Sequence, residues 1–146
     1  MSSIIFSKTA LLILISLLML VIQNSKAQNT EKMNNPKVIQ ITPQEALQLL
    51  EKDSAIMIDV REIEELEILS YDVDKVINIP LGAINNFEKQ VEDVSENRKI
   101  IMVCRSGRRS QKAAQILLQK GYSAVYNLKG GIIEWEKQQM KVKKGN

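Results

Sequence analysis

The only cysteine of the chain is followed at once by a short basic loop, and this combination could do chemistry. Residues 103–111 read Val-Cys-Arg-Ser-Gly-Arg-Arg-Ser-Gln, a pattern that predicts a strand end, a tight loop and a helix start. Such a loop can turn several backbone N–H groups inward, and these donors together with the helix dipole favour an anion. A cysteine beside them should ionise readily, because free Cys has a pKa of about 8.5 and comparable sites fall to roughly 3.5–7.5.

The glycine and the arginines of this loop fit a nucleophile that meets an oxyanion. Gly107 permits a sharp backbone path, and the arginines supply fixed positive charge. A lone cysteine after an apolar strand can instead be a small buried hydrophobe. Like charges on a short loop repel one another, however, unless an anion or an acidic partner compensates them. We therefore predict that Cys104 is the catalytic residue and that Arg105, Ser106, Gly107, Arg108 and Arg109 bind the substrate.

The residue counts exclude several classes of site. The chain has 146 residues, with one cysteine and no histidine. These counts rule out Ser-His-Asp and Cys-His catalysis, a Cys₂His₂ zinc site, His-ligated haem, an internal disulfide and a cysteine-bound iron–sulfur cluster. The length, with 45% hydrophobic and 25% charged residues, indicates one globular domain with a core of its own.

Residues 1–27 have the pattern of a secretory signal peptide. Lys8 supplies a positive charge, residues 10–22 are apolar except for one serine, and the small residues Ser25 and Ala27 precede the expected cleavage point. An apolar core of about 7–15 residues is typical of a signal peptide, whereas a membrane-spanning helix needs about 20. An uncleaved anchor stays open as an alternative. We expect export, to the periplasm, with cleavage after Ala27.

The elements that must position the cysteine loop alternate between short apolar runs and helical periods. Strands are predicted at residues 38–41, 55–59, 76–79, 99–103 and 124–128, and helices at residues 42–50, 61–69 and 87–94, after the cysteine loop up to Gly121, and from Ile132 onward. Continuous apolar strands alternating with helices favour a parallel sheet covered on both faces. In such sheets, sites form at the carboxyl ends of the strands, where Asp59 and Cys104 are expected.

Several stretches of the chain together resemble the rhodanese (thiosulfate sulfurtransferase) family. Residues 104–110 are similar to its active-site loop, commonly Cys-x-Ser-Gly-x-Arg-Ser in single-domain members. Residues 58–65 resemble the family's Asp-Val-Arg…Glu opening, residues 77–81 its Asn-Ile-Pro strand end, and residues 121–135 its closing segment. We therefore divide the chain into a signal peptide (1–27), a flexible leader (28–37), a rhodanese-like domain (38–140) and a basic tail (141–146).

The resemblance implies a fold, a reaction and roles for single residues. The fold would be a single α/β domain with a five-stranded parallel sheet and helices on both faces. The cysteine would take a sulfane sulfur from a donor such as thiosulfate or polysulfide and pass it to a thiol or to cyanide, with no cofactor and no metal. Cys104 would become the persulfide, the amides of residues 105–109 would cradle it, and Arg105 and Arg109 would lead in holding the donor. Asp59, Arg61 and Trp135 are expected to be structural.

One segment departs from the family pattern. Where the family usually has Gly-His-Ile-x-Gly-Ala, residues 69–76 read Leu-Ser-Tyr-Asp-Val-Asp-Lys-Val and form a slightly longer connection. A noncatalytic binding module with the same fold is an alternative function, although such a module usually loses its cysteine. A phosphatase or arsenate reductase is a further alternative, but its signature needs an arginine where this chain has Ser110.

The charge balance narrows the expected partners. The formal charge is +3, and removal of the signal peptide takes away Lys8 and Lys26 with no acid, which leaves +1. We therefore expect no nucleic-acid partner and no stable membrane insertion after cleavage. The expected partners are small sulfur-containing anions and a thiol or cyanide acceptor. Because an exported free thiol needs protection, a thiol reductant protein is a further expected partner.

Overall fold

The computed structural model describes residues 8–33, 37–91 and 98–145, and it divides into two units, Met1–Pro36 and Lys37–Asn146. The described residues of the first unit form one helix, α1 (Lys8–Met33), whose large apolar side chains between Leu11 and Ile22 are exposed. Among the described residues, no helix is both long and apolar enough to cross a membrane.

Helix α1 runs through the expected cleavage point after Ala27, so residues 28–33 are helical where a flexible leader was expected. The rest of that leader, residues 34–36, lies outside the described residues, as do residues 1–7 of the expected signal peptide. Both the signal peptide and its cleavage stay predictions.

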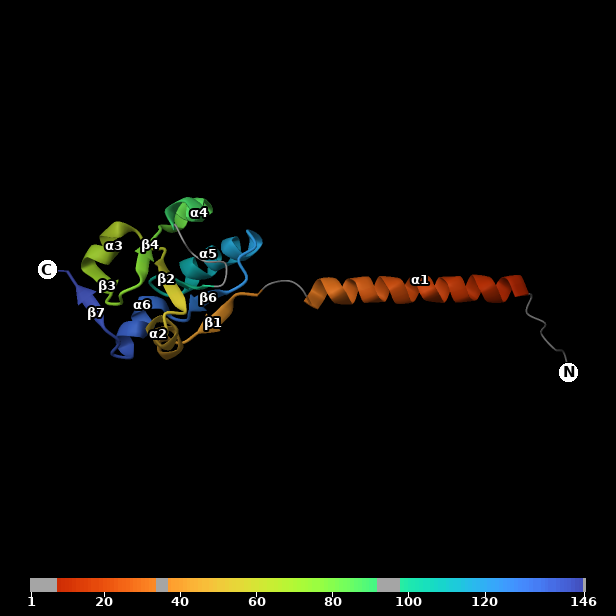
Figure 1. Cartoon of the computed structure of the whole chain (residues 1–146), viewed down its shortest axis with the longest axis horizontal. Coiled ribbons are helices and arrows are strands. Elements are labelled where there is room, and N and C mark those ends of the chain that lie inside the picture. The colour runs from red at the N-terminus through yellow and green to blue at the C-terminus, as the bar shows by residue number, and fades with distance from the viewer. Residues whose placement is uncertain (1–7, 34–36, 92–97, 146) are drawn as a thin grey trace. The chain divides into compact units, whose positions relative to one another are not determined.

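The second unit is built on a five-stranded sheet in the order β1-β6-β5-β2-β4, in which all strands are parallel (Figure 1). Its strands are β1 (Ile39–Ile41), β2 (Ala55–Asp59), β4 (Val76–Asn78), β5 (Lys99–Val103) and β6 (Val125–Leu128). This arrangement confirms the predicted five-stranded parallel sheet. Each strand lies within one residue of its predicted bounds, since short apolar runs bounded by turn residues are consistent with buried strands.

Helices cover both faces of this sheet, as predicted. The helices of one face are η1 (Leu81–Asn86), α4 (Phe87–Gln90) and α5 (Arg108–Gln119), and those of the other are α2 (Pro43–Glu51) and α6 (Gly131–Lys137). Alternate residues of β5 divide between the two cores, since successive strand side chains point to opposite faces: Ile100 and Met102 pack on the α5 side, and Ile101 and Val103 on the α6 side. Trp135 is buried in the second core, which confirms its packing role.

Two predicted helices are shorter in the structure. Helix α3 (Ile63–Ile68) occupies the middle of the predicted 61–69 segment, because Arg61 turns inward and Leu69 already begins a strand. Helix α4 accounts for the first part of the predicted 87–94 helix, and residues 92–97 lie outside the described residues.

A small second sheet was not predicted. Strand β3 (Leu69–Tyr71) pairs antiparallel with β7 (Val142–Lys144), so that Tyr71 lies opposite Val142. The segment expected to be a basic tail therefore contributes residues 142–144 to the folded unit, while Asn146 lies outside the described residues. Each of these strands has only three residues. A run this short shows no clear alternation of apolar and polar residues, so the sequence pattern alone does not identify it as a strand.

Candidate active site

Cys104 lies directly after β5, at the carboxyl edge of the sheet, and its side chain is almost fully buried, with 1% exposed. Its Sγ accepts a hydrogen bond from the backbone N–H of Gly107, with an N···S distance of 3.1 Å. It accepts a second from the hydroxyl of Ser110, with an O···S distance of 3.3 Å. The sulfur therefore sits inside the turn formed by the loop and the first turn of α5.

These donors decide the ionisation of the thiol. Burial by itself raises the pKa of Cys104, because a thiolate loses hydration inside the protein. Hydrogen bonds from the Ser110 side chain and from the backbone N–H groups of residues 110, 106 and 107 lower it by more. The pKa of Cys104 consequently lies below its ordinary value, which favours the nucleophilic thiolate.

Two glycines allow the rest of the chain to pack directly against the loop. Gly107 has a φ of +88°, and a Cβ there would lie 3.2 Å from the carbonyl oxygen of Leu128. Gly131 has a φ of +59°, and a Cβ there would overlap the carbonyl oxygen of Cys104 and lie 2.6 Å from the carbonyl carbon of Arg105. Only glycine fits both the left-handed backbone and the close approach at these positions.

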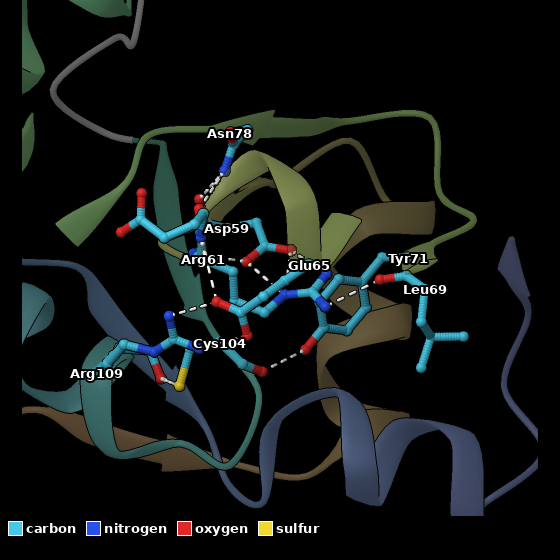
Figure 2. Close-up of polar contacts among 10 residues, drawn as sticks. Asp59, Arg61, Glu65, Leu69, Tyr71, Asn78, Cys104 and Arg109 are labelled. Carbon is cyan, nitrogen blue, oxygen red and sulfur yellow. Dashed lines mark hydrogen bonds and ion pairs between the residues drawn. The ribbon is translucent and has the colours of Figure 1, made fainter. Parts of the chain in front are cut away.

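The carbonyl groups of the loop are held by the surrounding protein. The Cys104 carbonyl accepts from the Ile132 N–H at 3.0 Å and from the Tyr71 hydroxyl at 3.2 Å, and Figure 2 shows Tyr71 pointing toward this carbonyl. The Gly107 carbonyl accepts from Nδ2 of Asn127 at 3.2 Å. With the carbonyls engaged from outside, the N–H groups of the loop are free to face the sulfur.

Asp59 and Arg61 have the structural role predicted for them. Their side chains form a buried ion pair, with 2.6 Å between Nη2 of Arg61 and Oδ2 of Asp59. Nη1 of Arg61 also donates to the carbonyl of Leu69 at 2.9 Å, and Nδ2 of Asn78 donates to the carbonyls of both members of the pair (Figure 2). The pair therefore ties the ends of β2 and β4 to the start of β3.

The three loop arginines have different surroundings. Arg109 makes a two-pronged ion pair with Glu65 of α3, with N···O distances of 2.6 and 2.7 Å (Figure 2). This pair lowers the pKa of Glu65 below its ordinary value and raises that of Arg109. Arg105, Ser106 and Arg108 are exposed beside the cysteine. The structure therefore brings the predicted site residues together, but engages one arginine with an acid of the protein itself.

Ser110 and Tyr71 contact the site although the sequence did not single them out. Ser110 is the third residue of α5 and is fully buried, so a serine in the first turn after Gly107 is a signal that could have found it. Tyr71 offers no such signal, because its approach to Cys104 depends on the pairing of β3 with β7.

The chain is similar in sequence and in structure to known proteins. Residues 42–138 match the model of the family described as rhodanese-like domain. A rhodanese-like domain-containing protein of Arabidopsis thaliana is 33% identical over 136 residues, which are 87% of this chain and 86% of that protein. A protein of Allochromatium vinosum named as a sulfurtransferase is 31% identical over 60% of this chain and 77% of its own length.

A putative sulfur carrier protein of Bacillus subtilis is 34% identical over 70% of this chain, but only over 53% of its own length, so this chain spans about half of that relative. Among solved structures, a rhodanese-related protein of Thermoplasma volcanium is similar, with 27% identity and a TM-score of 0.61 over 72% of this chain and 97% of that one.

Proposed function

The chain belongs to the rhodanese-like domain family, and on that premise we propose that it is a sulfurtransferase that works through a persulfide on Cys104. One observation carries the proposal: the sulfur of Cys104 lies inside a turn of donors, 3.1 Å from the Gly107 nitrogen and 3.3 Å from the Ser110 hydroxyl oxygen. These donors favour the thiolate without any histidine, which the chain lacks.

In the first half of the reaction, the Cys104 thiolate attacks the sulfane sulfur of a donor such as thiosulfate. A bond forms between the two sulfurs while the bond between the sulfane sulfur and the sulfonate breaks. Sulfite leaves with that electron pair, and Cys104 carries a persulfide anion. The negative charge then lies on the outer sulfur, where inward-facing N–H groups of the loop can stabilise it.

In the second half, a thiophilic acceptor attacks the outer sulfur of the persulfide. A thiolate acceptor becomes a persulfide and cyanide becomes thiocyanate, and in both cases Cys104 returns as the thiolate. No electrons enter or leave the protein overall. A role in sulfur transfer agrees with the name of the Bacillus subtilis relative, a putative sulfur carrier protein.

We assign attraction of the anionic donor to Arg105 and Arg108, because both are exposed beside the cysteine. Arg109 is held by Glu65, so it supports the loop and adds positive potential at short range. This division differs from the expectation that Arg109 holds the donor directly. Thiosulfate and polysulfide both suit such a site, since each is a small anion with a sulfane sulfur.

The proposal is tested by sulfur loading of the full chain. After incubation with thiosulfate or polysulfide, mass spectrometry should find one added sulfur atom on the peptide that contains Cys104, and thiocyanate should form when cyanide is added. The Cys104→Ser variant should do neither. No adduct from either donor and no thiocyanate would contradict the proposal, and a cysteine-dependent hydrolysis of aryl phosphates would favour a phosphatase instead.

We further propose that the chain is exported and cleaved after Ala27. The supporting features are the apolar run of residues 10–22, the small residues Ser25 and Ala27, and the division between residues 36 and 37 that separates this segment from the folded unit. Intact-mass measurement of the protein purified from an export-competent host should find a chain that begins at Gln28. A chain that retains residues 1–27 and fractionates with membranes would support the anchor instead.

A further inference from the structure

The thiol and the carbonyl of Cys104 are held from opposite faces of the sheet. The side chain of Cys104 packs in the core cluster that contains the buried residues of α5. Its carbonyl accepts hydrogen bonds from Ile132 and Tyr71, both of which belong to the core cluster on the other face. The backbone of Cys104 is therefore fixed between two sides: the side of the sheet on which its thiol lies, and the opposite side, here called the supporting side, whose residues donate to its carbonyl.

These hydrogen bonds to the Cys104 carbonyl affect the first peptide of the loop, which joins Cys104 to Arg105. In a trans peptide the C=O and the N–H lie in one plane and point in opposite directions, so two donors on the Cys104 carbonyl fix the orientation of the peptide from which the loop starts. That peptide leads directly to the N–H groups of Ser106 and Gly107, which bond the sulfur.

We propose that Tyr71 is a positioning residue of the sulfur-transfer site, whose hydroxyl fixes the peptide between Cys104 and Arg105 and thereby holds the N–H groups of Ser106 and Gly107 toward the sulfur. The inference rests on the proposed function. Tyr71 does not touch the reacting atoms and acts through the peptide. It comes from the very segment, residues 69–76, in which the sequence departs from the usual pattern of its family.

The surroundings of Tyr71 suit this role. Its side chain is only 2% exposed, and its ring packs edge-on against Trp135 with 5.4 Å between the ring centroids. Burial, together with the negative charge of Asp59, raises the pKa of Tyr71 well above its ordinary value, so that the hydroxyl stays protonated and donates throughout the working range of a thiolate. The ring is rigidly placed and the donor is always present.

The position of Tyr71 depends on the C-terminal strand. Tyr71 lies opposite Val142 in the β3–β7 pair, and the indole N–H of Trp135 donates to the carbonyl of Lys141 at 3.0 Å. The neighbouring N–H of Asp72 donates to the same carbonyl at 3.2 Å. The segment that looked like a basic tail thus holds the supporting side of the loop.

Four of the charged groups near Cys104 are paired with one another, while Arg105 and Arg108 of the loop are exposed beside it. Asp59 at the end of β2 pairs with Arg61, and Glu65 of α3 pairs with Arg109 of α5. Replacing the Tyr71 hydroxyl leaves both pairs in place. A change in Cys104 ionisation in such a variant therefore reports on the peptide and not on these charges.

The test compares Tyr71→Phe with the wild-type full chain. The variant keeps the ring against Trp135, and the Ile132 N–H still donates to the Cys104 carbonyl, so it should fold. The midpoint of the pH profile for alkylation of Cys104 should rise by roughly 0.3–0.5 pH unit, which is about two- to threefold in the ratio of thiolate to thiol. At pH values below both midpoints, the turnover number with thiosulfate should fall by a similar factor with an unchanged KM, and the amide ¹⁵N signal of Arg105 should move.

The matched control is Tyr122→Phe, because Tyr122 is a tyrosine on the opposite face whose ring packs on Phe87 at 5.3 Å. It should change neither the alkylation midpoint nor the Arg105 signal. A second variant, 3-fluorotyrosine installed at position 71, keeps the size of the ring and makes the hydroxyl a stronger donor, so its midpoint should move down.

An unchanged alkylation midpoint in Tyr71→Phe, or an unchanged Arg105 amide signal, would overturn the inference. An equal effect of Tyr122→Phe would do the same. The alkylation profile and the amide signal need no sulfur donor, so they decide the role of Tyr71 even if no persulfide forms. Failure of the proposed function and failure of this inference are therefore separate results.

Discussion

The two sides of the Cys104 loop are built in different ways. The side that faces the sulfur comes from one continuous stretch, residues 104–110, whose backbone N–H groups and Ser110 hydroxyl surround Sγ. The supporting side is assembled from three remote elements that supply Tyr71, Asn127 and Ile132 to its carbonyls. The comparison teaches that the chemical groups of this site are local in sequence, whereas the groups that orient them are not.

The largest effect should come from removing the proposed nucleophile on the sulfur-facing side. Cys104→Ser should lower sulfur transfer by roughly a thousandfold or more, because the hydroxyl is not ionised at neutral pH and forms no persulfide. Thiocyanate production and sulfur loading measure the loss. Thermal unfolding should change little, since serine is close in size to cysteine. Residual turnover within tenfold of wild type would mean that another group carries the reaction.

The next effect tests the supporting side by steric means. Gly131→Ala should destabilise the fold by about 2–4 kcal/mol and distort the loop, because a Cβ there would overlap the Cys104 carbonyl oxygen and the residue has a positive φ. Denaturant unfolding and sulfur transfer measure the two consequences.

Two other glycines separate the causes of that loss. Position 121 has a positive φ, and the Cβ added by Gly121→Ala would have nothing within 4 Å. The Cβ added by Gly82→Ala would also lie in open space, but position 82 has no positive φ. The expected order of destabilisation is position 131, then 121, then 82. Equal losses at 131 and 121 would show that backbone strain alone matters, and that close packing on the loop does not.

A smaller effect sharpens the role of the local donors. Ser110→Ala removes a hydroxyl that lowers the pKa of Cys104, so the alkylation midpoint should rise and sulfur transfer near pH 7 should fall by about five- to tenfold. The deficit should shrink as the pH rises above both midpoints, where the thiol ionises in either protein. Ser106→Ala is the control, because Ser106 contributes its backbone N–H, which the variant keeps. A matching shift in that control would contradict the assignment.

The smallest effect concerns the ion pair that joins the loop to α3. Glu65→Gln should cost about 0.5–1 kcal/mol of stability at pH 7, because the pair with Arg109 is about one-third exposed and screened by water. The pKa of Glu65 is depressed in the folded protein, so this stability is present above the unfolded pKa of glutamate and is lost as the pH falls through the folded value. The difference in unfolding free energy between variant and wild type should therefore close in acid. A difference that stays constant below pH 4 would exclude the ion pair as its source.

The sequence predicted most of the main sheet and the cysteine loop, for identifiable reasons. Strand β5 is a run of apolar residues that ends at Cys104, and α5 repeats its buried residues at helical spacing up to the stop at Gly121. The resemblance of residues 104–110 to the rhodanese loop is supported by the family match over residues 42–138. The pairing of Asp59 with Arg61 was also predictable, since the two residues are neighbours at a strand end.

The sequence did not predict contacts that join distant segments. Arg109 was expected to hold the donor, but Glu65, 44 residues away, engages it across the loop. Strands β3 and β7 were missed because each has three residues and their partners are separated by most of the folded unit. Without that pair, nothing in the sequence places Tyr71 beside Cys104.

The sequence by itself therefore determined the candidate nucleophile, the sharp turn at Gly107, the basic loop and the alternation of strands with helices, because backbone preferences and apolar periodicity act over a few residues. Only the tertiary structure decided which arginine is held by an acid, which hydroxyl faces the sulfur and which side chain fixes the Cys104 carbonyl. Those contacts depend on the order and register of the strands, which bring distant residues within hydrogen-bonding range and which no local pattern specifies.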